Sequence, residues 1–194
     1  MDSREKTRQK GNIDPVNWLD NHGDALYAFA LMRVRDPRQA EDLVQETLLA
    51  ALESVENFKG KSTERTWLIG ILKHKVLDYH RHRGREKSLS DEDEAGMEKS
   101  SLFDETGHWT IKPRDWGEPE RSLEQEQFWN IMSNCVEDLP EKSRTLFVLR
   151  EFDGIETGKL LETLNISSKN NLWVMLSRAR LHLRHCLETN WFKG

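Results

Sequence analysis

Apolar residues recur at steps of three and four through most of this 194-residue chain. The clearest run follows Asp36-Pro37, where the recurring positions are Ala40, Leu43, Val44, Thr47, Leu48, Ala51, Leu52 and Val55. Such steps place side chains on one face of an α-helix, whereas a half-buried strand alternates with a period of two. Glycine and proline, which interrupt helices, number only 11 and 5. The pattern predicts an all-α fold.

Helix starts and breaks divide the chain into two predicted domains. Asp14-Pro15 and Asp36-Pro37 each place a capping acid before a proline at the first helical position. We expect an N-terminal helical bundle over residues 14–83 and a C-terminal helix-turn-helix domain over residues 122–190. Residues 84–121 have no sustained period and are rich in Asp and Glu, so we interpret them as an acidic linker.

The net charge of -5 conceals an uneven distribution of charge. Residues 59–87 carry nine basic and three acidic side chains, and residues 169–194 carry five and one. Residues 14–58 carry three basic and nine acidic side chains, and residues 88–126 carry four and twelve. Local positive fields, rather than net charge, attract polyanions. A basic block is often only a solvated helix face, but each block here lies on the last long helix of a predicted domain, which favours nucleic-acid binding.

Several classes of protein are disfavoured by what the sequence lacks. Its apolar runs are far shorter than the roughly 18 residues of a membrane span, and its first 20 residues hold cations without an apolar core. We therefore expect no secretory signal, no direct membrane insertion and a cytoplasmic location. Nucleophile elbows, phosphate loops and metal-binding helix motifs are also missing, so we expect no enzyme activity, cofactor or small-molecule substrate.

The cysteines and histidines are the residues of this chain most able to bind a metal ion. Cys135 and Cys186 are too few for a disulfide framework and do not have the spacing of a zinc motif. His182, His185 and Cys186 could loosely hold a metal, but the sequence offers them no fourth ligand, so we expect no metal site. His74, His80 and His82 also do not have the usual ligand spacing.

The C-terminal domain contains a helix-turn-helix pattern. Residues 160–164 and 172–180 are helical in period, and the polar segment Asn165–Ser168 separates them. Asn165 occupies the position at which such a turn takes a left-handed residue, usually Gly. A generic helical hairpin explains this pattern about as well as a DNA-binding motif does.

Longer strings carry a family resemblance. Residues 39–52 read QAEDLVQETLLAAL and residues 58–72 read FKGKSTERTWLIGIL. Together they resemble the core-binding and promoter-melting segments of bacterial RNA polymerase sigma factors. Residues 139–154, LPEKSRTLFVLREFDG, and residues 177–181, SRARL, resemble the beginning and end of the last domain of those proteins. Two domains joined by one short linker are similar to the extracytoplasmic-function (ECF) group.

The resemblance implies a protein that binds core RNA polymerase and directs promoter-specific transcription initiation. In the family the second helix binds a coiled coil of the largest polymerase subunit, and the matching residues here are Asp42, Gln45 and Glu46. Residues three and four apart share a helix face, so the three fit one contact surface. Without the resemblance they would be interpreted as a solvated face.

The resemblance further implies that the loop before the third helix and the exposed face of that helix open minus-10 DNA. The matching residues are Phe58, Lys59, Gly60, Lys61, Ser62, Arg65, Lys73, His74, Lys75 and Asp78. Flipping a base costs a few kcal/mol and needs phosphate contacts in return, which the cations can supply. We interpret Phe58 as an anchor of the loop rather than a stacking group, and Trp67 as a core residue.

The last domain is expected, by resemblance, to recognise minus-35 DNA. The candidates are Lys169, Asn170, Asn171, Trp173, Ser177 and Arg178. Leu161 and Asn165 replace the small residue and the Gly usual in the family, and the turn is one residue longer, so the register of the helix stays open. Trp173 is either a DNA contact or a core residue, and we favour the core.

Two further expectations come from the family. Its linker threads the polymerase channel that later takes nascent RNA, and Asp91–Glu94 suit such a path, although a solubilising spacer is equally possible. An anti-sigma factor commonly holds ECF proteins off DNA, and we expect it to dock on apolar faces between the domains. The main alternative is a stand-alone helix-turn-helix regulator, which leaves Asp42, Gln45 and Glu46 unexplained; a protein-interaction module is a weaker rival.

Overall fold

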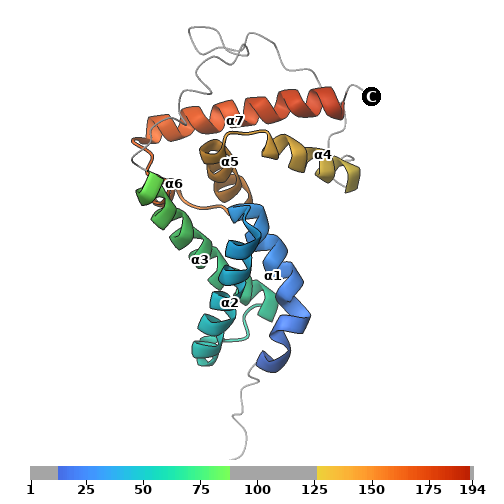
Figure 1. The fold of residues 1–194 in the computed structure, drawn as a ribbon, viewed down its shortest axis with the longest axis vertical. Coiled ribbons are helices and arrows are strands. Elements are labelled where there is room, and N and C mark those ends of the chain that lie inside the picture. Colours follow the sequence, from blue (N-terminus) through green and yellow to red (C-terminus); the bar gives the residue numbers. More distant parts are fainter. Residues whose placement is uncertain (1–12, 88–125, 193–194) are drawn as a thin grey trace, which may run out of the picture. The chain divides into compact units, whose positions relative to one another are not determined.

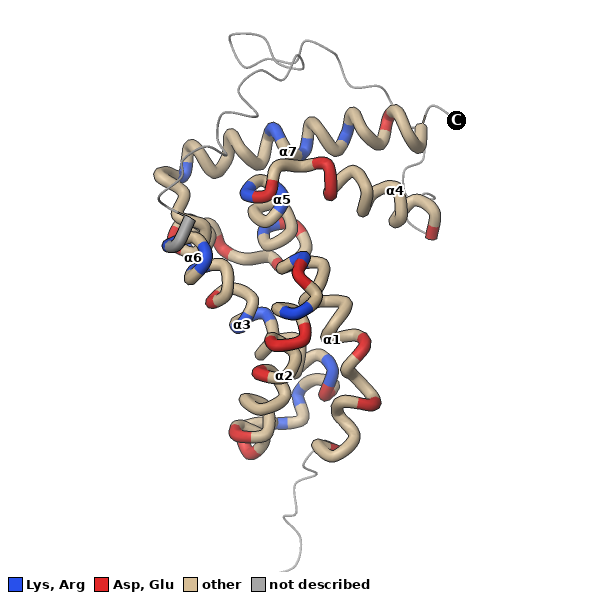
Figure 2. The backbone as a smooth tube through the Cα atoms, in the orientation of Figure 1, with Lys and Arg blue, Asp and Glu red and all other residues tan. Residues whose placement is uncertain are grey.

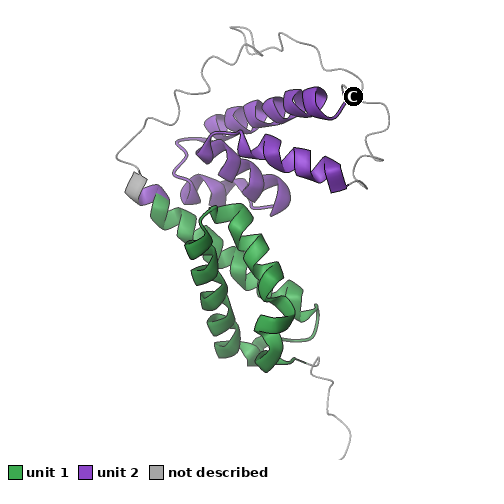
Figure 3. Ribbon diagram, turned by 45° about the vertical axis from the view of Figure 1, so that its right-hand side comes forward, with its two compact units in different colours: residues 1–83 green, residues 84–194 purple. Residues whose placement is uncertain are grey.

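The computed structural model describes residues 13–87 and 126–192, and within these ranges all regular structure is helical. The all-α prediction is thus confirmed (Figure 1). Contacts divide the chain into two compact units, Met1–Arg83 and Gly84–Gly194 (Figure 3). Most of the predicted linker, including Asp91–Glu94, lies outside the described residues. No helix in the described ranges is long and apolar enough to cross a membrane.

Residues 13–87, which contain the described part of unit 1, form three α-helices and two short 3₁₀ turns. They are η1 (Pro15–Asn17), α1 (Trp18–Val34), α2 (Pro37–Glu53), η2 (Val55–Asn57) and α3 (Glu64–Lys87). The last helix extends past the predicted boundary at residue 83, so residues 84–87 of the expected linker are helical.

The two Asp-Pro signals produce different helix starts. The Asp36 carboxylate accepts hydrogen bonds from the backbone N–H groups of Arg38 at 2.9 Å and Gln39 at 3.2 Å, and α2 begins directly after it. The Asp14 carboxylate instead accepts a hydrogen bond from the side-chain amide of Asn17 at 2.7 Å, and a 3₁₀ turn precedes α1. The same dipeptide thus starts an α-helix only where its carboxylate caps the backbone.

The core of unit 1 forms where the apolar faces of its helices meet. Helices α1 and α2 lie side by side (Figure 1). The side chains buried to 2% exposure or less are Trp18, Leu26, Ala30, Ala40, Thr47, Ala51, Leu68, Leu72, Val76 and Leu77. Because these residues fill one face of each helix, the opposite faces of α2 and α3 carry polar side chains outward.

Unit 2 is built around its longest helix. The elements are α4 (Glu126–Glu137), α5 (Glu141–Phe147), a π-helical continuation η5 (Val148–Phe152), α6 (Thr157–Thr163) and α7 (Lys169–Asn190). Helices α4, α5 and α6 all contact α7 (Figure 1). The cluster that holds α4 to α7 includes Phe128, Val136, Leu139, Leu183 and Leu187.

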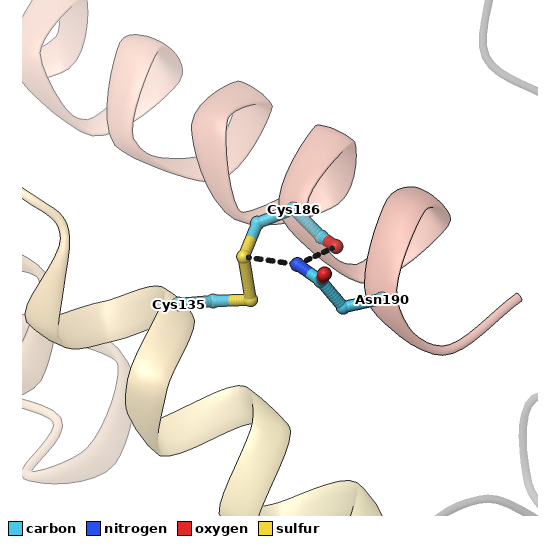
Figure 4. Close-up of a disulfide and its surroundings, with 3 residues drawn as sticks. All are labelled: Cys135, Cys186 and Asn190. Carbon is cyan, nitrogen blue, oxygen red and sulfur yellow. Dashed lines mark hydrogen bonds between the residues drawn. A yellow bond between two sulfur atoms is a disulfide. The ribbon is translucent and has the colours of Figure 1, made fainter.

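A disulfide joins Cys135 of α4 to Cys186 of α7 (Figure 4). Two cysteines are too few for a framework of several disulfides, and this single bridge is not predictable from the sequence. Two cysteines 51 residues apart do not reveal from their spacing whether they meet. Packing of α4 on α7 brings their Cα atoms to 5.8 Å, within the range that a disulfide can span.

Candidate functional site

One face of α2 gathers the residues predicted to bind polymerase. Asp42, Gln45 and Glu46 are all exposed. Leu43 and Val44, which lie between Asp42 and Gln45 in the sequence, are buried. The apolar stripe therefore fixes the rotation of α2, and the three polar side chains share the outward surface, as their spacing predicts.

A hollow beside this face adds residues that the sequence argument missed. Its volume is about 430 Å³, and it lies between α1 and α2. The lining residues are Leu19, Asp20, Gly23, Asp24, Tyr27, Glu41, Val44 and Gln45. Asp20 and Asp24 are four apart on α1 and could have been found as a second acidic face, but only packing places them beside α2.

An ion pair connects the polymerase candidates to the DNA candidates within unit 1. Nζ of Lys75 on α3 lies 3.1 Å from Oε2 of Glu46 on α2. The two side chains remain 34% and 55% exposed, so water screens their attraction. The sequence predicted both residues as site residues but not their contact, because it does not define how α2 packs on α3.

The loop before α3 is held by an aromatic anchor. Phe58 is 8% exposed, and its ring lies 5.2 Å from the ring of Trp67, which in turn lies 5.9 Å from that of Trp18. The predicted anchor role of Phe58 fits this packing, and Trp67 is half-buried in the same stack. Because the Phe58 ring is packed inside, it is not positioned to stack on a DNA base in this structure. The residues that follow it, Lys59–Ser62, are exposed.

The backbone of that loop turns at a glycine. Gly60 has a φ of 65°, a left-handed conformation that side chains with a Cβ disfavour. Lys59 and Lys61 flank it and are exposed. The turn thus presents two cations next to a residue with no side chain, where a phosphate or base can approach the backbone closely.

Glu64 ties the loop end of α3 to the start of α1. Its Oε1 accepts hydrogen bonds from the backbone N–H of Asp14 at 2.6 Å and from Nε1 of Trp18 at 3.1 Å. Nε2 of His22 lies 3.4 Å from its other oxygen. Burial alone would raise the pKa of Glu64, but the hydrogen bonds from Trp18, Asp14 and His22, with the charge of His22, together lower that pKa. Glu64 is not among the residues predicted from the sequence, although an acid in the first turn of a helix is a recognisable signal.

The exposed face of α3 carries the remaining minus-10 candidates. Arg65, His74 and Asp78 are exposed, and Lys73 and Lys75 are half-buried. From the first of these to the last, the helix rises about 20 Å, which matches the span of several nucleotides of a single strand. Asp78 also pairs with Arg81 at 2.8 Å, so the carboxylate is partly neutralised on a face that is otherwise basic.

The helix-turn-helix pattern of unit 2 is present as α6, a turn and α7. Asn165 has a φ of 48°, which confirms the expected left-handed turn position. The hydroxyl of Ser168 accepts a hydrogen bond from the backbone N–H of Asn171 at 3.1 Å and caps α7. This cap sets the start of α7 at Lys169.

The outward face at the start of α7 contains the minus-35 candidates. Lys169, Asn170, Trp173 and Ser177 are exposed, whereas Asn171 and Arg178 are half-buried. The side-chain amide of Asn171 donates to the Ser167 hydroxyl at 3.3 Å, which holds it toward the turn. Figure 2 shows basic residues recurring along α7.

The preferred assignment of Trp173 to the core is wrong. Its side chain is 42% exposed, and the guanidinium carbon of Arg150 lies 5.7 Å from the centre of its ring. The buried stripe of α7 passes through Leu172, Met175, Leu176 and Ala179. Residue 173 is about 100° round the helix from residue 172, so its helical phase outweighs its apolar character.

Within the two described ranges, no group of three or more His, Cys, Asp or Glu side chains is arranged to hold a metal. Cys186, which lies near His182 and His185 in the sequence and could have joined them in binding a metal, forms a disulfide with Cys135.

Comparisons with known proteins cover most of the chain. The family described as Sigma-70 region 2 matches residues 18–86. A Haemophilus influenzae protein described as "Probable RNA polymerase sigma factor" is 37% identical over 167 residues, 84% of each chain. The "ECF RNA polymerase sigma-E factor" of the same organism is 27% identical over 157 residues, 81% of this chain and 79% of that one.

A solved structure, that of the sigma factor RpoE of Bartonella quintana in complex with the anti-sigma factor NepR, also aligns with the chain. The alignment covers 90% of this chain and 97% of that one, at 24% identity and a TM-score of 0.44. The sequence relationships are the stronger finding. They show that the chain belongs to the RNA polymerase sigma factors, which bind core RNA polymerase and direct transcription from specific promoters, and that it is similar to members of the extracytoplasmic-function group.

Proposed function

We propose that this sigma factor works through three separate surfaces: the exposed face of α2 for core polymerase, the loop 58–63 with α3 for minus-10 DNA, and the start of α7 for minus-35 DNA. One observation carries the proposal. Most candidate side chains of each surface are exposed, on the outward face of α2, on the loop 58–63 and the outward face of α3, and on the first turns of α7, while the apolar stripes of these helices are buried.

The polymerase surface is acidic. Asp42 and Glu46 carry negative charge, Gln45 adds an amide, and the hollow beside them contributes Asp20 and Asp24 of α1. A partner helix that presents Arg or Lys would satisfy these carboxylates with charge-assisted hydrogen bonds. We therefore extend the proposed contact from α2 to the neighbouring face of α1.

The minus-10 surface combines cations with a shaped turn. Lys59 and Lys61 flank Gly60, and Arg65, Lys73 and Lys75 continue the positive charge along α3. Phosphate contacts of this kind position a strand without reading its sequence. A flipped base would have to enter beside the loop backbone rather than stack on the buried Phe58.

The minus-35 surface has the geometry of a recognition helix. Lys169, Asn170 and Trp173 project from the first turns of α7, the part that enters the major groove in helix-turn-helix proteins. Asn side chains can pair with adenine edges, and Lys with guanine edges or phosphates. The inward-held amide of Asn171 instead stabilises the turn.

The remaining roles follow from this assignment. The chain would act in the cytoplasm, where core polymerase and DNA meet, without a catalysed reaction of its own. Residues 14–83 and 122–190 would be its functional domains, and 84–121 its linker. An anti-sigma factor would restrain it by covering exposed apolar side chains. Such side chains occur in both units, namely Leu19, Met32, Leu49 and Leu52 in unit 1 and Trp129, Phe152 and Trp173 in unit 2.

Paired variants test whether the surfaces are separate. Asp42→Ala with Gln45→Ala should weaken binding to core polymerase by tenfold or more while the circular dichroism spectrum is unchanged. Glu53→Ala, an exposed acid at the end of the same helix, is the matched control and should bind normally. Equal loss of binding and helical content would assign Asp42 and Gln45 a folding role and contradict the proposal.

A second pair addresses DNA. Lys169→Ala with Asn170→Ala should leave core binding intact but remove minus-35 protection from footprints of the polymerase complex. His185→Ala, exposed near the other end of α7, should leave the footprint as it is. Unchanged protection in the first variant would place the minus-35 contacts elsewhere.

A further inference from the structure

We propose that Cys135 and Cys186 form a reversible thiol–disulfide switch that sets how firmly α4 is held to α7. The inference rests on the proposed function in two respects, the cytoplasmic location and the role of α7 in reading minus-35 DNA. It concerns a modification site at the opposite end of α7 from the proposed minus-35 surface.

The two sulfurs lie in different surroundings. Cys135 is fully buried in the cluster between α4 and α7, whereas Cys186 is half-buried at the edge of that cluster. Figure 4 shows the bridge reaching from one helix to the other, with Asn190 beside it. Of the two cysteines, Cys186 is therefore the one that a reagent can approach more readily from outside.

The proposed cytoplasmic location favours a reversible disulfide over a permanent structural one. Disulfides are rare in the cytosol because cellular dithiols keep thiols reduced, and those that do form there are commonly transient and redox-sensing. The bridge in this protein closes a segment of chain with a sequence separation of 51 residues. Removing a long-range link of this kind releases substantial conformational freedom, so the two redox states should differ measurably in stability.

The chemistry is an exchange with a small disulfide such as oxidised glutathione. The Cys186 thiolate attacks one sulfur of that disulfide and releases one glutathione thiolate. The Cys135 thiolate then attacks the Cys186 sulfur, forms the internal bridge and releases the second glutathione thiolate. The protein thus loses two protons and two electrons, and one glutathione disulfide becomes two thiols.

Asn190 is positioned to assist the first step. Its side-chain N–H group lies 3.3 Å from the Cys186 sulfur and also donates to the Cys186 carbonyl at 2.9 Å. Cys186 lies near the C-terminal end of α7, where the helix dipole disfavours a thiolate. A hydrogen bond to sulfur opposes that effect, so Asn190 is a positioning residue for the attacking thiolate.

The disulfide affects binding of minus-35 DNA indirectly, through the stability of unit 2. Cys186 is about 25 Å along α7 from Lys169, too far for contact with the proposed minus-35 surface. The aromatic contact between Phe128 of α4 and Trp191, with ring centres 5.7 Å apart, does not involve the bridge and should remain when the bridge is reduced. Reduction should therefore weaken the packing of α4 on α7 and leave α7 itself folded. The reduced form should then lose DNA binding at a lower temperature than the oxidised form.

Hydrogen exchange on the full-length protein tests the switch. One sample is oxidised with oxidised glutathione and the other reduced with dithiothreitol. We expect amides of residues 126–137 to exchange at least tenfold faster in the reduced protein, and the Cys186→Ser variant to match reduced wild type under both conditions. Equal exchange in oxidised and reduced wild type would overturn the proposal, and so would a Cys186→Ser variant that matches the oxidised protein.

A titration tests reversibility. In glutathione buffers that span cytosolic ratios, mass analysis of alkylated thiols should show a bridge that opens and closes without denaturant. A bridge that stays closed in all these buffers would overturn the switch and leave a structural staple. Neither measurement involves polymerase or DNA, so it can fail or succeed independently of the proposed promoter roles.

Two further measurements complete the test. Asn190→Ala should slow bridge formation about threefold or more at unchanged exchange protection of the oxidised form, and an unchanged rate would remove Asn190 from the mechanism. The oxidised protein should retain binding to mixed-sequence duplex DNA at temperatures where the reduced protein has lost it. Loss at the same temperature would contradict the effect on DNA reading.

Discussion

At the scale of single residues, Glu64 contributes a charge that holds two parts of unit 1 together. Its hydrogen bonds from Asp14 and Trp18 link the start of α1 to the first turn of α3. Its carboxyl pKa is lowered in the folded state, from an ordinary value of 4.5. The charged form is therefore the one that stabilises the fold, fully above that value, and this stability is lost as the pH falls through the lowered pKa.

We predict that Glu64→Ala destabilises unit 1 by about 1 kcal/mol at pH 7, because it removes the acceptor of the half-buried Trp18 indole N–H and of the exposed Asp14 backbone N–H. Glu64→Gln should cost less, and the difference in unfolding free energy between wild type and Glu64→Gln should shrink as the pH falls below about 4.5. Urea unfolding followed by pulsed hydrogen exchange on peptides from residues 13–87 measures both effects. The exposed Glu53→Gln change is the control, and a wild-type advantage that persists at low pH would show that charge is not the cause.

Asn165 carries a backbone demand that few residues meet. Its φ of 48° lies in the left-handed region at the turn between α6 and α7. We predict that Asn165→Gly leaves stability nearly unchanged, while Asn165→Val costs about 1–2 kcal/mol because a branched Cβ clashes in that conformation. The same unfolding assay on peptides from residues 126–192 provides the readout. If the valine variant were as stable as wild type, the turn would have another conformation in solution.

At the scale of helices, the ion pair between Glu46 and Lys75 couples two proposed surfaces. Each side chain has a second proposed role, polymerase contact on α2 for Glu46 and DNA phosphate contact on α3 for Lys75. Exposed pairs of this kind contribute about 0.2–1 kcal/mol. If polymerase engages Glu46 as proposed, Lys75 would become available to DNA at small cost.

We predict that Glu46→Ala strengthens binding of unit 1 to mixed-sequence single-stranded DNA, by up to about fivefold at low salt, because it releases Lys75. Lys75→Ala should weaken that binding, and the double variant should resemble Lys75→Ala. Fluorescence anisotropy with the full-length protein measures the cycle, with Glu53→Ala as the control for simple loss of an acid. If Glu46→Ala increased DNA affinity equally in the Lys75→Ala variant, the cause would be general repulsion between the Glu46 carboxylate and DNA phosphates. The ion pair with Lys75 would then not be responsible.

The helices were predictable from the sequence because their determinants are local. The period of apolar residues and the Asp36 cap define α2 without knowledge of its neighbours. Contacts between helices were not predictable in the same way, which is why the Glu64 hydrogen bonds, the Glu46–Lys75 pair and the Cys135–Cys186 bridge were missed. The prediction that Trp173 lies in the core is wrong because it followed the apolar character of the side chain and not the position of residue 173 around the helix.

At the scale of the whole molecule, charge is arranged by surface rather than by total. A net charge of -5 would disfavour DNA as a partner. Exposed acids occur on α1 and α2, and exposed or half-buried cations on the loop before α3, on α3 and along α7. Figure 2 shows how the charged residues are distributed over the helices of each unit. Such a separation allows one chain to bind a protein that presents cations and also a polyanion, each through its own surface.

The most direct test of this account is transcription by core polymerase on sheared genomic DNA, with the 5′ ends of the transcripts sequenced. We predict that adding the protein concentrates these ends at defined positions, downstream of two shared sequence elements at a fixed spacing. The Asp42→Ala, Gln45→Ala variant should abolish the effect, while the Glu53→Ala control retains it. Transcript ends that are the same with and without the protein would contradict its central role, the direction of polymerase to promoters.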